Sequence, residues 1–203
     1  MDVHDPGPHW NNRYASTSAV YGYGPNAFFA DELKTLTPGR LLLPGDGEGR
    51  NACHGAEQGW SVRSFDASEV GVQKGLQWAA ERGVQIESEV GDCRTWVPQE
   101  SFDAIGLFYL HLPADVRSAF HKRVKTWLKP GGALILEGFA PGQLQFSSGG
   151  PKKRDMLFTV EMLEADFSGL EIHHCATREV ELDEGPFHQG RAEVTRLTAR
   201  RQN

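Results

Sequence analysis

Three glycines alternate with acidic residues directly after a short apolar run. The run is Arg40–Pro44 (RLLLP), and Gly45-Asp46-Gly47-Glu48-Gly49 follows it, with a predicted helix opening at Arg50. Glycines at a strand-to-helix junction allow backbone to approach a ligand without an intervening Cβ. A dinucleotide loop needs its third glycine three positions after the second, and a P-loop needs Gly-Lys before Ser or Thr. Neither pattern is present, and the two acids disfavour phosphate, so the loop suits a positively charged ligand.

Two further carboxylates follow the next two predicted strands. Asp66 ends one strand, in Asp66-Ala67-Ser68, and Asp92 follows another, in Gly91-Asp92-Cys93. An acid about 20 residues beyond a glycine loop commonly holds the two ribose hydroxyls. By itself such an aspartate is also a common helix N-cap. A carboxylate at Asp92 can accept a hydrogen bond from an exocyclic amine such as that of adenine. Together the three loops predict a site for a cationic nucleoside cofactor.

The elements that position these residues alternate between strand and helix. The alternation predicts a parallel, doubly wound α/β sheet. The predicted strands are 40–44, 60–66, 84–90, 102–109 and 133–139, and the predicted helices are 26–36, 50–58, 69–82, 113–128 and 160–166. Two long strand-like stretches follow, Leu170–Leu182 and Arg191–Arg200. The connection between them, residues 183–190, is too short for a parallel crossover, so the two strands must be antiparallel. The prediction is a seven-stranded sheet of five parallel strands plus a C-terminal antiparallel hairpin.

These motifs, in this order, carry a resemblance to a known family. The glycine loop, Asp66, the Gly91-Asp92-Cys93 loop and the Leu-Lys-Pro-Gly-Gly of residues 128–132 resemble the class I S-adenosylmethionine-dependent methyltransferases, over residues 40–139. That family usually has an acid two residues before the first glycine. Leu43 stands there in this chain, so Asp46 and Glu48 are expected to supply the polar groups near the sulfonium and amino group.

A narrower set of motifs is similar to the small methyltransferases of the tellurite-resistance and thiopurine type. The similar segments are Trp10-Asn11-Asn12-Arg13-Tyr14, Tyr23-Gly24-Pro25-Asn26, residues 45–52 and His111-Leu112-Pro113. The resemblance implies a Rossmann-like methyltransferase fold, with S-adenosylmethionine as cofactor and S-adenosylhomocysteine as product. It also implies methyl transfer to a small-molecule acceptor such as a thiol or a selenium or tellurium compound.

Roles for individual residues follow from this resemblance. The expected cofactor-binding residues are Gly45, Asp46, Gly47, Gly49, Arg50, Asn51, Asp66, Ala67, Ser68, Gly91, Asp92, Cys93 and Arg13. Within this set, Asp66 would accept from the ribose hydroxyls, and Asp92 with the Cys93 amide would read the adenine edge. Arg13 or Arg50 would hold the carboxylate of the cofactor through charge-assisted hydrogen bonds. A solvated surface role for Arg13 remains an alternative.

Methyl transfer requires little from the protein beyond positioning of the reactants. Methyl transfer from a sulfonium is an in-line displacement, which alignment and water exclusion accelerate. A thiol, selenide or similar soft anion needs no base, whereas a hydroxyl or amine is helped by one. His111 is the predicted base, with a packing or capping role as the alternative. The candidate acceptor-pocket residues are Tyr14, Tyr21, Tyr23, Phe108, Tyr109 and Gln143, and residues 145–153 are expected to form a lid.

Length, charge and cysteine content restrict the remaining possibilities. The 203 residues predict one domain, with an arm and helix at 1–38, a cofactor-binding core at 39–140, and a lid segment, helix and hairpin at 141–203. The net charge of −6 and the lack of a basic stripe argue against nucleic acid as partner. No apolar run reaches membrane-spanning length, no signal peptide is evident, and the three cysteines lack metal spacing. These features predict a cytoplasmic protein without a metal. Two alternatives remain: a nicotinamide-dependent oxidoreductase, and an S-adenosylmethionine-binding module without catalysis.

Overall fold

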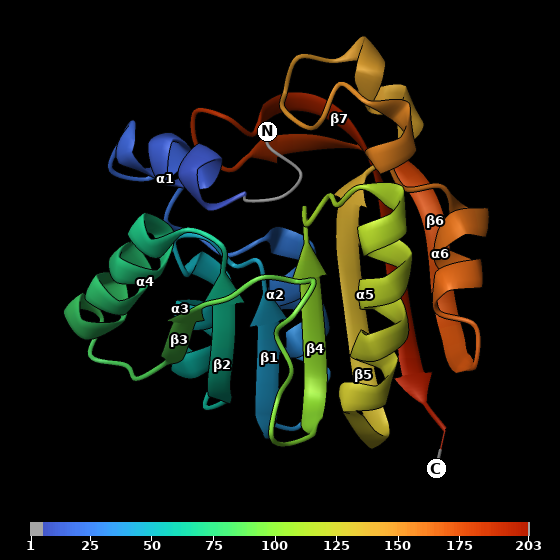
Figure 1. The fold of residues 1–203 in the computed structure, drawn as a ribbon, viewed down its shortest axis with the longest axis horizontal. Coiled ribbons are helices and arrows are strands. Elements are labelled where there is room, and N and C mark those ends of the chain that lie inside the picture. Colours follow the sequence, from blue (N-terminus) through green and yellow to red (C-terminus); the bar gives the residue numbers. More distant parts are fainter. Residues whose placement is uncertain (1–5, 203) are drawn as a thin grey trace.

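The computed structural model describes residues 6–202 as one seven-stranded sheet (Figure 1). Residues 1–5 of the predicted arm and residue 203 lie outside the described range. The strand order is β3-β2-β1-β4-β5-β7-β6. The strands are β1 (Arg40–Pro44), β2 (Ser61–Asp66), β3 (Glu87–Val90), β4 (Phe102–Phe108), β5 (Leu128–Phe139), β6 (Leu170–Asp183) and β7 (Gln189–Arg201). The helices are α1 (Gly7–Ala15), α2 (Ala27–Leu33), α3 (Arg50–Glu57), α4 (Glu69–Glu81), α5 (Ala114–Trp127) and α6 (Val160–Asp166), with 3₁₀ turns η1 (Pro141–Gln145) and η2 (Arg154–Met156).

The pairing confirms the predicted seven-stranded topology. Strands β1 to β5 pair in parallel, while β7 pairs antiparallel with both β5 and β6. Successive side chains of a strand point to opposite faces, and β1 shows how each face is filled. Leu41 and Leu43 enter a core shared with α2 and α3, whereas Leu42 enters the core shared with α5 and α6. A strand with apolar side chains on both faces requires helices on both sides, and the alternating chain supplies them.

Element ends differ from the prediction mainly at β3 and β5. Strand β3 begins at Glu87 rather than at residue 84 and is largely exposed at the edge of the sheet. Strand β5 begins at Leu128, so the Lys-Pro-Gly-Gly segment lies within its bounds. Leu128 pairs with Phe102, and a register shift then carries the pairing to Ala104 with Ala133. The segment between the predicted helix 113–128 and the predicted strand 133–139 is therefore an irregularity inside a longer strand.

The predicted helices begin at residue 26, and the structure adds helix α1 within the arm. Pro6 occupies the N-cap position and Pro8 the first turn, where a missing N–H costs nothing. Of the residues in α1, only Gly7 and Tyr14 are buried. The helix therefore lacks the broad apolar stripe by which amphipathic helices are usually found in a sequence.

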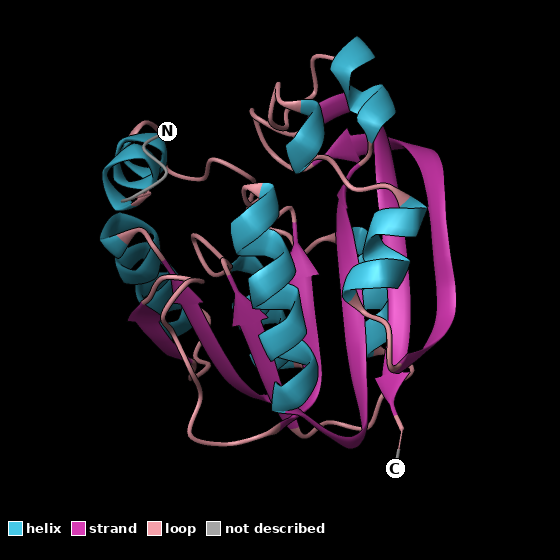
Figure 2. Cartoon of the chain, turned by 45° about the vertical axis from the view of Figure 1, so that its right-hand side comes forward, coloured by secondary structure: helices cyan, strands magenta, loops and turns pink. Residues whose placement is uncertain are grey.

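The arm and the C-terminal hairpin meet above the carboxyl ends of the parallel strands (Figures 1 and 2). At the contact, backbone touches backbone: a Cβ added to Gly185 at the hairpin tip would lie 2.3 Å from the amide nitrogen of Gly22. Gly185 also has a φ of 81°, a conformation that side chains disfavour. Only glycine fits this crossing, which brings the arm and the hairpin tip together over one edge of the sheet.

Candidate cofactor and acceptor site

The glycine loop after β1 is closed on two sides by other segments. Gly47 has a φ of 59°, and a Cβ added there would lie 2.3 Å from the hydroxyl oxygen of Tyr14. The amide of Gly47 donates to Oδ2 of Asp66 at 2.9 Å. The arm and the end of β2 therefore both contact the loop directly, which requires glycine at its centre.

Asp66 organises the loop around it while keeping acceptor capacity. Its Oδ2 accepts from Gly47 and its Oδ1 accepts from the amide of Ser68 at 2.8 Å. Burial raises the pKa of Asp66 to about 6, and these two backbone hydrogen bonds oppose that rise. Each carboxylate oxygen has a second lone pair. The side chain can therefore position the loop and still accept from a diol.

Asp46 is the half-buried carboxylate of the loop. Its Oδ2 accepts from the amide of Ala52 at 3.0 Å, which satisfies one orphan donor at the start of α3. Burial raises the pKa of Asp46 to about 7, with the Ala52 hydrogen bond and the Arg50 charge acting against it. A carboxyl group with a pKa near 7 is only partly ionised at neutral pH, and a cation bound beside it favours the ionised form.

Asp92 lies at the same edge of the sheet, and its side chain is partly exposed. Arg94 forms an ion pair with it through Nε and Nη2, and this hydrogen bonding lowers the pKa of Asp92 despite partial burial. Beside it, the carbonyl of Cys93 accepts from Arg123. Three carboxylates therefore follow β1, β2 and β3 at one edge, and this acceptor set suits an ammonium, a diol and an exocyclic amine.

Glu48, expected near the sulfonium, faces the arm instead. Its side chain is buried, with Oε2 accepting from the amide of Val20 at 2.8 Å and Oε1 accepting from Lys74 Nζ at 2.9 Å. The same Nζ donates to the carbonyls of Tyr14 and Thr17. Because the Glu48 carboxylate is buried against the arm, where Lys74 balances its charge, Asp46 is the loop acid that remains for a ligand.

The first residues of α3 also connect distant segments. Arg50 Nη2 donates to Oε2 of Glu184 at 2.8 Å, and its Nη1 donates to the carbonyl of Tyr21. Asn51 Oδ1 accepts from the amide of Asn26 at 2.9 Å. Arg50 is therefore engaged by the hairpin. Of the two arginines predicted to hold a cofactor carboxylate, Arg13 remains, lying 4.4 Å from the ring centroid of Phe187.

An aromatic cluster surrounds His188 at the hairpin tip, and we call it the His188 cluster. Its ring lies 4.5 Å from Tyr21, 4.4 Å from Tyr109 and 5.2 Å from Phe139, measured between centroids. Tyr109 follows β4 with a φ of 52°, which is an unusual conformation for a bulky residue and one that clusters at functional sites. The cluster joins the arm, the ends of β4 and β5, and the hairpin.

Three predicted pocket residues lie elsewhere. Tyr23 is 51% exposed and packs on Trp78, and Phe108 belongs to the core against Phe29. Gln143 is buried, with Nε2 donating to Ser148 and Oε1 accepting from the amide of Glu193. Of the six, Tyr14 lies against Gly47 of the glycine loop, and Tyr21 and Tyr109 flank His188.

His111 has both ring nitrogens occupied. The amide of Phe139 donates to Nε2 at 3.0 Å, and Nδ1 lies 2.7 Å from the carbonyl of Met156. An amide only donates and a carbonyl only accepts, so the ring is the neutral form with its proton on Nδ1. Its ring also stacks on Phe158, at 4.6 Å between centroids. This geometry favours the packing role over the role of general base.

We expect His111 to make the fold sensitive to acid. Burial lowers its pKa from 6.5 to about 4, so the unfolded chain binds this proton first as the pH falls. The contribution of His111 to stability is complete above pH 6.5 and is lost between pH 6.5 and 4, by about 3 kcal/mol. Urea unfolding across this range should show a shallower pH slope for His111→Gln, while His173→Gln, with an exposed side chain, should keep the wild-type slope. Equal slopes in all three proteins would contradict this.

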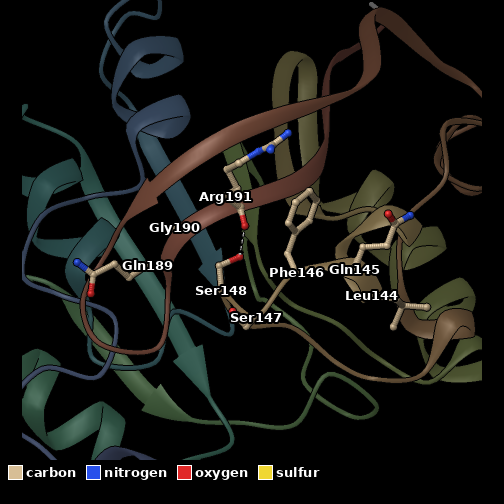
Figure 3. A pocket seen from close by; sticks show the side chains of 8 residues that line it. All are labelled: Leu144, Gln145, Phe146, Ser147, Ser148, Gln189, Gly190 and Arg191. Atoms are coloured by element: carbon tan, nitrogen blue, oxygen red, sulfur yellow. Dashed lines mark hydrogen bonds between the residues drawn. The ribbon is translucent and has the colours of Figure 1, made fainter.

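A hollow of about 360 Å³ lies between the lid segment and the start of β7 (Figure 3). Ser148 donates to the carbonyl of Arg191 across it at 2.6 Å. Its lining residues are Leu144, Gln145, Phe146, Ser147, Ser148, Gln189, Gly190 and Arg191. None of them belongs to the glycine loop or the His188 cluster, so the hollow marks where the lid rests on the hairpin.

Sequence reasoning missed the buried polar network beneath the His188 cluster. Glu137 is 1% exposed, and its Oε1 accepts from Tyr109 Oη at 2.9 Å and from Asn26 Nδ2. Its Oε2 accepts from Arg196 Nε on the neighbouring strand. The sequence did contain a sign of this network: a glutamate within an apolar strand that is covered on both faces must be paired.

Comparison with known proteins agrees with this geometry. A family model described as "Methyltransferase domain" matches residues 42–132. "Probable thiol methyltransferase 2" from Arabidopsis thaliana is 32% identical over 149 residues, which cover 70% of this chain and 65% of that protein. The structure of TehB from Haemophilus influenzae has a TM-score of 0.74 at 18% identity, covering 88% of this chain and 63% of that one. Magnesium protoporphyrin IX methyltransferase from Synechocystis, solved with S-adenosylmethionine bound, has a TM-score of 0.70 at 19% identity, covering 100% and 98%.

The sheet order is that of the class I S-adenosylmethionine-dependent methyltransferase fold, and residues 42–132 match a methyltransferase domain. S-adenosylmethionine is the methyl donor typical of that family. None of the comparisons described above supports the oxidoreductase alternative. Among residues 6–202, no helix is long and apolar enough to cross a membrane. Within the same range, no group of three His, Cys, Asp or Glu side chains is placed to hold a metal ion.

Asp46 should make cofactor binding depend on pH. If its carboxylate receives the ammonium of S-adenosylmethionine, binding favours the ionised form of a group whose pKa is about 7 in the free protein. Affinity is then expected to rise roughly tenfold from pH 6 to pH 8, with a proton released below pH 7. Calorimetry in buffers of different ionisation enthalpy measures that release. Asp46→Asn should bind more weakly with a flat profile, and a flat wild-type profile would contradict the assignment.

Proposed function

We propose that this chain transfers a methyl group from S-adenosylmethionine to a small thiol or a similar soft nucleophile. The observation that carries the proposal is the His188 cluster. It forms a compact aromatic site beside the glycine loop, bounded by the arm on one side and the hairpin on the other. Aromatic faces attract a sulfonium and exclude water from the displacement. The similarity to a probable thiol methyltransferase supports the same acceptor class.

The cofactor supplies an activated methyl group on a sulfonium, and the residues present fit it. In the proposed arrangement, Asp46 receives the ammonium, Asp66 the ribose hydroxyls and Asp92 with the Cys93 amide the adenine edge. Arg13 holds the carboxylate. Tyr14 and Tyr21 close over the glycine loop from the arm. The protein's contribution is then alignment of the acceptor with the methyl group and exclusion of water.

Two measurements test the proposal in sequence. Thermal unfolding with S-adenosylhomocysteine should shift upward, because a ligand that binds only the folded state stabilises it. Formation of S-adenosylhomocysteine is then followed with matched acceptors: an alkanethiol, an arenethiol and selenide against a phenol, an amine and a carboxylate. Turnover of the sulfur and selenium compounds is expected. Turnover of only the oxygen or nitrogen acceptors would overturn the acceptor class, and binding without any turnover would indicate a catalytically silent module.

A further inference from the structure

The proposed function leaves one chemical problem unsolved. A thiol with an ordinary pKa of about 8.5 is mostly protonated at neutral pH, and the thiolate is the nucleophile. The expectation that no base is needed therefore holds only for an acceptor that is already an anion, and a protonated thiol needs a base within reach of its proton. His111, the histidine predicted for that task, has both ring nitrogens occupied by backbone groups.

His188 has the complementary arrangement. Its Nδ1 lies 3.3 Å from Oε2 of Glu184. A carboxylate only accepts, so the proton of the neutral ring is on Nδ1 and Nε2 carries the lone pair. Among the described residues, Nε2 makes no hydrogen bond. This nitrogen is also not fully buried. Across residues 6–202, the fully buried side-chain atoms without a hydrogen bond are Nε2 of His54 and Nε of Arg123.

The surroundings of His188 fix the orientation of its ring and place Nε2 beside the lid segment, where a Cβ added to Gly149 would lie 3.3 Å from it. The hairpin tip is a tight turn, in which the amide of Glu184 donates to the carbonyl of His188 and the amide of His188 donates to the carbonyl of Gly185. Tyr21 and Tyr109 pack against the ring. The ring is therefore fixed by its own turn, by a carboxylate on one nitrogen and by aromatic side chains.

We propose that His188, oriented by Glu184, is the general base that deprotonates a thiol acceptor in this site. Nε2 takes the S–H proton, and the sulfur lone pair forms the new bond to the methyl carbon. The carbon–sulfonium bond breaks, and its electron pair stays on the cofactor sulfur, giving S-adenosylhomocysteine. The imidazolium beside the Glu184 carboxylate then loses its proton to water. This inference rests on the proposed function and specifies the acceptor as a thiol that is protonated at neutral pH.

The charges around the ring are consistent with a base that is free at neutral pH. Burial lowers the pKa of His188, the Glu184 hydrogen bond raises it, and the Arg50 charge lowers it. Glu137 also raises it, and His111, Tyr21 and Tyr109 are the other titratable groups nearby. The net effect lowers the pKa of His188 below its ordinary value, which favours the neutral imidazole that can accept a proton.

The test compares acceptors that differ in whether they carry a proton. An alkanethiol is protonated at pH 7, whereas a strongly acidic arenethiol such as pentafluorothiophenol is already the thiolate. His188→Gln should lower kcat/KM for the alkanethiol roughly 10²- to 10⁴-fold while changing that for the arenethiolate only a few-fold. Raising the pH toward the alkanethiol pKa should restore much of the lost rate. His173→Gln, on the same hairpin, should behave as wild type with both acceptors.

The remaining outcomes separate this inference from the function on which it rests. Thermal stabilisation by S-adenosylhomocysteine checks that His188→Gln is folded, and Glu184→Gln provides a second variant, with a smaller loss on the same acceptor. Equal losses on both acceptors would show that His188 only packs the site, with thiol methylation intact. If the wild-type protein methylates neither acceptor, the proposed function fails and the base assignment fails with it.

Discussion

Replacing Glu137 with alanine should cost about 3–5 kcal/mol of unfolding free energy, the effect expected when one member of a buried ion pair is removed. Glu137 is 1% exposed and accepts from Asn26, Tyr109 and Arg196. Without it, three donors from three separate segments lose their acceptor, and the Arg196 guanidinium keeps an unbalanced charge. For a chain of this length the thermal midpoint should fall by roughly 10 °C.

A second glutamate on the same sheet provides the control. Glu179 pairs with Arg191 across β6 and β7, and the two side chains are 56% and 65% exposed. Glu179→Ala should cost less than about 1 kcal/mol, because exposed pairs contribute little. Glu137→Gln, which keeps the shape and removes the charge, should fall between the two alanine variants. Similar losses for both alanine variants in urea titrations would show that burial does not decide the value of these pairs.

Lys74→Met should release the arm from the glycine loop. Lys74 Nζ donates to Glu48 and to the carbonyls of Tyr14 and Thr17. Methionine keeps the apolar stem but leaves the buried Glu48 carboxylate without its cation, at a cost of about 3 kcal/mol. Tyr14 then loses its fixed position over Gly47, and affinity for S-adenosylmethionine should fall roughly tenfold or more, since 1.4 kcal/mol is a factor of ten.

Two variants make the Lys74 result specific. Adding Glu48→Gln to Lys74→Met should recover part of the lost stability, because it removes the unpaired charge. Lys34→Met removes a lysine from an exposed pair with Asp31, whose side chains are 67% and 74% exposed, and should change neither stability nor affinity measurably. Unchanged cofactor affinity in Lys74→Met would show that the position of the arm does not contribute to cofactor binding.

The sequence was most informative where local pattern and tertiary environment agree. The strand 40–44 and the helix 160–166 were predicted with the observed bounds, because an apolar run and a capped helix are local features. Helix α1 was missed because it begins with prolines and buries few side chains. Its position depends on Lys74, which lies about sixty residues along the chain, and no local pattern reports that contact.

The histidines show the limit of residue type as evidence. His111 and His188 both lie near the carboxyl edge, and the sequence favoured His111 because it follows a strand. What distinguishes the two is that, within residues 6–202, both ring nitrogens of His111 have partners, whereas only Nδ1 of His188 has one. For His111 the partners are the carbonyl of Met156 and the amide of Phe139. Backbone partners carry no side-chain signature, so only the folded geometry identifies them.

The network around α3 also bears on whether this chain can be dissected. The family model matches residues 42–132, the range that a truncated core would keep. Within that stretch, however, Glu48 is held partly by Val20, Arg50 by Glu184, and Asn51 by Asn26. A fragment trimmed to the matched range would leave these polar groups without their partners. We therefore expect limited proteolysis in the arm or at the hairpin tip to unfold the nucleotide-binding half as well, so that the chain behaves as one indivisible unit.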